Sequence, residues 1–176
     1  MILDDFNEKI VQWAKEREID KKGTVQGQSI KTIEEISELI KGLCKGKKDL
    51  VSDAVGDVYI TLILGDMLQE KIDFGEILAD EKKIISAWDK PYPKLSDNDK
   101  ILFITTQLAR SITTIASLKK PYDIAVMSNI MNYLFIICHE YNLSFQDCIE
   151  SAYEEIKNRK GKVIDGRFVK ESDFIC

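Results

Sequence analysis

The residues of this sequence that could do chemistry are carboxylates, and they are concentrated in two neighbouring segments. Three lie before the short break Lys45–Lys48 and two lie after it: Glu34, Glu35, Glu38, Asp53 and Asp57. One lysine, Lys31, accompanies them, and no histidine does. A cluster of oxygen ligands suits a hard cation such as Mg²⁺ or Mn²⁺. The pattern therefore predicts a divalent-metal site held by Glu35, Glu38, Asp53 and Asp57.

The segment before the break has the periodicity of an amphipathic helix. At about 100° per residue, its aliphatic side chains form one face, which is expected to be core: Ile33, Ile36, Leu39, Ile40 and Leu43. A second stripe carries an amide, a cation and two carboxylates: Gln28, Lys31, Glu35 and Glu38. The alternative is that glutamates such as Glu34 belong only to a solvated face.

The segment after the break, Leu50–Leu68, is apolar nearly all round, which is typical of a buried helix. Asp53 and Asp57 are four residues apart and share one face of it. An ionised carboxylate in such a setting is unfavourable unless it is paired or bound to a metal. An antiparallel hairpin about Gly46 would bring Glu38 level with both aspartates.

This run resembles the MazG-like, all-α nucleoside triphosphate pyrophosphohydrolases, which carry E-x-x-E followed by E-x-x-D on the next helix. The first element is Glu35-Ile-Ser-Glu38, and the second is Asp53-Ala-Val-Gly-Asp57. Ala54 occupies the usual glutamate position, and the aspartate lies one residue earlier. The resemblance covers most of residues 1–70 and the basic tail near 157–170.

The resemblance implies an Mg²⁺-dependent hydrolase that splits nucleoside triphosphates between the α and β phosphates, giving a monophosphate and pyrophosphate. Such an enzyme would have a housecleaning role, removing unwanted triphosphates from the nucleotide pool. Glu35, Glu38 and Asp57, with Asp53, would hold Mg²⁺ or Mn²⁺, and Glu34 or Glu38 would accept the proton of the attacking water.

Substrate contacts are expected from the same stripe and from two distant segments. Gln28 and Lys31 would face the nucleotide, and Lys157 and Arg159 would meet phosphate if the tail folds back over the site. A solvated helix end is the alternative for the tail. Trp13 would stack on the base or belong to the core, and the polar loop 18–25 could act as a lid.

Three other functions stay open from the sequence. One is a base-selective dUTP or dCTP pyrophosphatase, because dimeric enzymes of that kind resemble this fold. Another is a non-catalytic protein that binds a metal or a nucleotide. The third is a purely helical interaction module. Turnover of any nucleotide with Mg²⁺ would exclude the last two.

The rest of the chain also has helical periodicity, so the predicted class is all-α. Further helices are expected at 4–17, 71–88, 97–115, 123–141 and 144–159. Asp165-Gly166, between two apolar pairs, predicts a short C-terminal β-hairpin with a type I′ turn.

A shift of 75 residues places the second half of the chain over the first. The carboxylates Glu35, Glu38, Asp53 and Asp57 then correspond to Arg110, Thr113, Ser128 and Asn132. This predicts one MazG-like domain, 1–176, built from an active unit, about 1–90, and a degenerate unit, 96–160. The two units would pack as a pseudo-dimer in an antiparallel bundle, and a homodimer would use another surface.

Composition limits the partners. The 176 residues are 44% hydrophobic and 31% charged, with a net charge of −5, which argues against nucleic-acid binding. The N-terminus lacks the shape of a signal peptide, and no apolar run reaches membrane-spanning length. Four cysteines show no C-x-x-C pair. A cytoplasmic protein without a membrane partner is expected.

Overall fold

The computed structural model describes residues 2–69, 81–89, 95–117 and 119–174. Within these ranges the predicted all-α class is confirmed, with eight α-helices and one short hairpin. The helices are α1 (Ile2–Glu16), α2 (Ile19–Lys22), α3 (Val25–Lys45), α4 (Lys48–Gln69), α6 (Glu81–Asp89), α7 (Asp97–Ser117), α8 (Ile124–Glu140) and α9 (Phe145–Ile156). The hairpin consists of β1 (Gly161–Ile164) and β2 (Arg167–Lys170), followed by the 3₁₀ turn η1 (Glu171–Phe174).

Local sequence explains the α3–α4 hairpin. Thr24 caps α3 by accepting a hydrogen bond from the Gly27 amide at 3.0 Å. Gly46 ends the helix with φ 60°, a left-handed conformation that glycine adopts without strain. The predicted break at Gly46 is therefore confirmed, and α4 returns antiparallel to α3.

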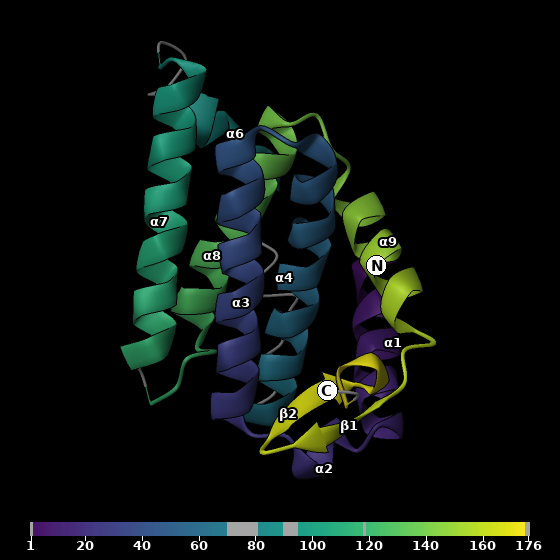
Figure 1. The fold of residues 1–176 in the computed structure, drawn as a ribbon. Coiled ribbons are helices and arrows are strands. Elements are labelled where there is room, and N and C mark those ends of the chain that lie inside the picture. The colour runs from purple at the N-terminus through teal and green to yellow at the C-terminus, as the bar shows by residue number, and fades with distance from the viewer. Residues whose placement is uncertain (1, 70–80, 90–94, 118, 175–176) are drawn as a thin grey trace.

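The core is centred on α4. Its aliphatic side chains are buried nearly all round, as predicted for a helix without a polar face. Figure 1 shows α3 between α4 and α7, while α9 and α1 lie on the far side of α4. The most extensive contacts of α4 are with α3 and α9, so helices from opposite ends of the chain enclose it.

The second helical pair, α7 and α8, covers the other side of α3. The helix α7 packs on α3 and α8, and α8 also touches α4. Trp88 of α6 donates a hydrogen bond to Glu140 at 2.7 Å, which attaches α6 to the end of α8. The bounds of α7 and α8 are compatible with the 75-residue shift, and the division into an active and a degenerate unit stays a prediction.

The C-terminal hairpin lies across the end of the bundle where α3 begins (Figure 1). Ile164 pairs with Arg167, and both turn residues, Asp165 and Gly166, have positive φ, so the predicted type I′ turn is confirmed. The Thr24 amide donates to the Gly166 carbonyl at 3.0 Å. A Cβ on Gly27 would stand 2.3 Å from the Gly166 carbonyl oxygen. Glycine at both 27 and 166 therefore permits the hairpin to pack against the start of α3.

Two expectations about connections need correction. Residues 19–22 form the helix α2 rather than a polar loop, because Ile19 is buried in the core and Glu18 turns the chain with φ 56°. The helix expected to end at residue 88 includes Asp89, the last residue of α6. Most of the predicted helix 71–88, and the stretch 90–94, lie outside the described residues.

Candidate acidic site between α3, α4 and α9

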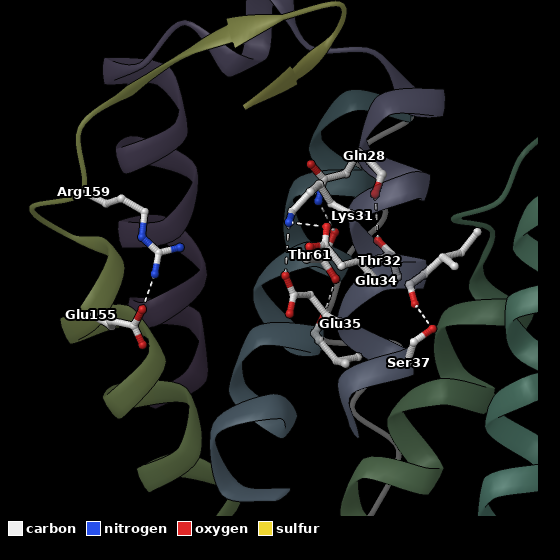
Figure 2. Close-up of polar contacts among 11 residues, drawn as sticks. Gln28, Lys31, Thr32, Glu34, Glu35, Ser37, Thr61, Glu155 and Arg159 are labelled. Atoms are coloured by element: carbon white, nitrogen blue, oxygen red, sulfur yellow. Dashed lines mark hydrogen bonds and ion pairs between the residues drawn. The ribbon is translucent and has the colours of Figure 1, made fainter. Parts of the chain in front are cut away.

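The α3 stripe presents a linked set of charges. Figure 2 shows the Lys31 ammonium between Glu34 and Glu35, paired with Glu34 and 3.5 Å from the Glu35 carboxylate. Burial opposes the charge of Lys31, but its pairing with these two carboxylates outweighs burial and raises the pKa of Lys31. Burial is also the main reason that the pKa of Glu35 is raised, with Glu34 and Glu38 adding to it and Lys31 opposing it.

The α4 carboxylates lie in a field that disfavours their charge. Burial raises the pKa of Asp57 to about 7, and the negative charges of Glu35, Asp53 and Glu155 add to the shift. The pKa of Asp53 is raised by burial, then by Glu155 and Glu38. The structure therefore places Asp57 within electrostatic range of Glu35 and Asp53, and Glu38 within range of Glu35 and Asp53.

Glu155, which the sequence did not single out, belongs to the same acidic set. It lies on α9 and forms an ion pair with Arg159, one turn later. In Figure 2 this pair faces the same space beside α4 as Glu35 and Lys31 do. Glu155 is separated from Asp57 by about a hundred residues, so periodicity within one helix could not reveal that α9 packs on α4.

Two cations face the acids from the C-terminal segment. Burial and the neighbouring acids raise the pKa of Asp53 and Asp57, and Arg159 partly opposes the rise at both, as Lys170 of β2 does at Asp53. The predicted placement of Arg159 near the acids thus agrees with the geometry. Lys157 lies elsewhere. It pairs with Glu154 and lines a hollow of about 360 Å³ between α1 and α9.

Gln28 does not face the site as expected. Its side chain is buried and donates to the Thr61 carbonyl of α4 at 3.2 Å. The helical periodicity places Gln28 on the same stripe as Lys31, but its side-chain amide donates a hydrogen bond to the backbone of α4 instead. Gln28 therefore fastens α3 to α4 and is not available to a ligand in this arrangement.

Trp13 also takes a packing position. The indole is 5% exposed, donates to the Ile156 carbonyl at 2.8 Å, and lies edge-on to Phe168. The guanidinium of Arg17 lies 4.7 Å from the centre of its ring. Stacking on a base would require Arg17 or Phe168 to move, so the core alternative describes Trp13 better.

The carboxylates converge without forming a preassembled cage. Among the described residues, no three histidine, cysteine, aspartate or glutamate side chains stand close enough together to hold a metal ion. The donor set is nonetheless all oxygen, which fits Mg²⁺. Burial, followed by the negative charges of Glu35, Asp53 and Glu155, raises the pKa of Asp57. A divalent cation would offset both effects, so it fits the residues present.

The fold and site together define a helical-bundle protein with an acidic centre and a basic C-terminal hairpin. No family model and no solved structure matches the chain. The chain is similar to an uncharacterized 18.2 kDa protein in the rep-hol intergenic region of Haemophilus phage HP1 (strain HP1c1). The two are 28% identical over 159 residues, which covers 85% of this chain and 97% of the phage protein.

None of the helices in the described ranges combines the length and the apolar character needed to cross a bilayer.

Proposed function

We propose that this protein is a MazG-like, Mg²⁺-dependent nucleoside triphosphate pyrophosphohydrolase. It would cleave a ribo- or deoxyribonucleoside triphosphate between the α and β phosphates, releasing a monophosphate and pyrophosphate. The reaction comes from the motif resemblance of Glu35-x-x-Glu38 and Asp57. The structural observation that carries the proposal is the position of Asp57, a half-buried carboxylate among three other acids with a pKa raised to about 7.

The residues that would hold Mg²⁺ are Glu35 and Glu38 of α3 and Asp53 and Asp57 of α4. When bound, the ion supplies charge neutralisation at the phosphate oxygens and lowers the pKa of a bound water. Glu35, Asp53 and Glu155 repel the ionised form of Asp57, and a bound divalent cation would reduce this repulsion. Metal binding and ionisation of Asp57 are therefore linked.

The chain's own residues would bind and orient the phosphates. Arg159 stands beside the acids and carries a planar fork of donors suited to phosphate. Lys170 of β2 adds a second positive charge on the same side of the cluster. Lys31 would keep Glu35 in place through their ion pair rather than meet phosphate, since its ammonium already serves two glutamates.

Glu34 and Glu38 differ as acceptors for the proton of the attacking water. Glu34 is paired with the Lys31 ammonium, so taking up a proton would break this ion pair. Glu38 is exposed, and no hydrogen bond or ion pair engages it among the described residues. Glu38 is therefore the better general base of the two.

The deciding experiment is pyrophosphate release from a panel of common and damaged triphosphates by the purified chain with Mg²⁺. Asp57→Asn should abolish turnover, because it keeps the shape but removes a charged ligand. Asp49→Asn is the matched control, since Asp49 lies in the first turn of the same helix. Full activity in Asp57→Asn would refute the site.

The same panel separates the competing functions. Strong preference for one pyrimidine would indicate a base-selective pyrophosphatase. Metal or nucleotide binding without turnover, measured by calorimetry, would indicate a non-catalytic binding protein. If the protein neither binds nor hydrolyses a nucleotide, the helical interaction module is the function that remains.

A further inference from the structure

Arg17 at the end of α1 makes an unusual set of contacts for a residue outside the acidic site. Its guanidinium donates to three backbone carbonyls: Arg159 at 2.8 Å, Lys157 at 3.0 Å and Trp13 at 3.1 Å. The guanidinium also lies over the Trp13 indole, 4.7 Å from the ring centre. Its side chain is 16% exposed and forms an ion pair with Glu16 at 3.6 Å.

These contacts complete the C-terminal end of α9. The last carbonyls of a helix have no partner within the helix. Here Trp13 of α1 donates to the carbonyl of Ile156, the last residue of α9, which also accepts from the Arg159 amide. Arg17, which directly follows α1, donates to the carbonyls of Lys157 and Arg159, in the segment that follows α9. We use the name α1 clamp for the pair Trp13 and Arg17.

The α1 clamp fixes the residue that faces the acids. Arg17 holds the backbone of Arg159, while the Arg159 side chain pairs with Glu155 and acts electrostatically on Asp53 and Asp57. Immediately after it, the chain enters β1. The backbone position of Arg159 therefore depends on a residue more than 140 positions earlier in the sequence.

We propose that Arg17 is a positioning residue for substrate binding: it holds the backbone of Arg159 so that the Arg159 guanidinium can exchange its pairing with Glu155 for a pairing with phosphate. This inference rests on the proposed function and assigns Arg17 no contact with substrate. A lysine cannot replace it, because one ammonium lacks the rigid fork that reaches three carbonyls at once.

The test is a double-mutant cycle on the full chain with Mg²⁺ and the best triphosphate of the panel. Arg17→Lys should lower kcat/KM about tenfold, chiefly through KM, because small displacements of a binding group are costly. In an Arg159→Ala background, the same Arg17→Lys change should have less than about a twofold effect, because the group it positions is gone. Arg110→Lys is the matched control, an exposed arginine on α7 whose effect should be negligible.

A second perturbation guards against an Arg17 variant that folds poorly. Trp13→Phe removes the indole N–H to Ile156 together with part of the ring, and should raise KM in the wild-type background but not in Arg159→Ala. Hydrogen exchange of the amides at 157–161 should quicken in both clamp variants, and thermal melts report their global stability.

The outcomes distinguish this inference from the function on which it rests. A wild-type chain that hydrolyses no triphosphate overturns both. An active wild type with an unchanged KM in Arg17→Lys overturns the positioning role alone. Equal Arg17→Lys effects with and without Arg159 also overturn it, since Arg17 would then act on the fold in general.

Discussion

Asp57 lies in surroundings that oppose its own charge. It lies on a helix that is otherwise buried in aliphatic packing, and three neighbouring carboxylates add to the effect of burial. A sequence pattern can indicate such a residue, because an aspartate in the middle of an apolar helix is rare without a compensating partner. It cannot supply the partner on α9, since Glu155 approaches only through tertiary packing.

The raised pKa of Asp57 makes stability depend on pH in a definite direction. Because the folded-state pKa, about 7, exceeds the ordinary value of 3.8, the folded protein holds this proton more tightly than the unfolded chain does. Stability is then lost as pH rises from about 4 to about 7, and the unfavourable contribution is fully present above pH 7. Metal binding would oppose that loss.

Asp57→Asn should therefore stabilise the metal-free protein at pH 8 by roughly 2–4 kcal/mol, because the amide keeps the shape without the charge. The gain should shrink toward pH 5 and vanish below about pH 4. Urea unfolding with a chelator at several pH values measures it, with Asp49→Asn as control. A gain that does not change with pH would contradict the assigned cause.

At the scale of elements, the sequence predicts local structure well and contacts between distant elements poorly. The end of α3 at Gly46 and the turn at Asp165-Gly166 follow from local backbone preferences and are confirmed. The missed helix α2 depends on burial of Ile19, and the inward turn of Gln28 depends on the α4 backbone. Both features depend on contacts with other helices, which the sequence of one segment does not reveal.

Docking of the hairpin on α3 gives a sharp prediction at this scale. Gly27→Ala should undock the hairpin and lower the free energy of unfolding by about 2–3 kcal/mol, because the new Cβ would meet the Gly166 carbonyl at 2.3 Å. Urea unfolding and hydrogen exchange of residues 161–170 measure this.

Gly46→Ala is the comparison for that experiment. A Cβ on Gly46 would meet nothing within 4 Å, so only backbone strain, about 1 kcal/mol, is expected. Unchanged hairpin protection in Gly27→Ala would show that the two glycines are not needed for docking.

At the scale of the molecule, the four carboxylates proposed to hold Mg²⁺ belong to the first half of the chain, while Glu155 and part of the helical cover come from the second half. If the second half is a degenerate unit, its counterpart positions carry no metal. Arg110→Ala and Asn132→Ala should each leave Mg²⁺ affinity within about twofold of wild type, measured by calorimetry, because neither changes a carboxylate of the cluster. A large loss of affinity in Asn132→Ala would contradict the assignment of one site to the first half.

The enclosure of α4 predicts how a truncated chain behaves. A fragment of residues 1–90 lacks α7, α8 and α9, and so uncovers faces of α4 that carry Ile60, Ile63 and Leu64. Such a patch should drive aggregation or self-association. Sedimentation of the fragment and the full chain tests this. A folded, monomeric and active fragment would show that the second half is an appendage.

The contact between α4 and α9 also has a consequence for synthesis in the cell. Gly56 of α4 lies so close to α9 that an added Cβ would stand 2.3 Å from the Cys148 carbonyl oxygen, so this seam closes only when α9 is present. Ribosomes add roughly 5–20 residues per second, so α4 emerges about 5–20 s before the helix that covers it. During that interval the apolar face of α4 that α9 will cover is unprotected, and we expect the growing polypeptide to engage chaperones until α9 leaves the ribosome.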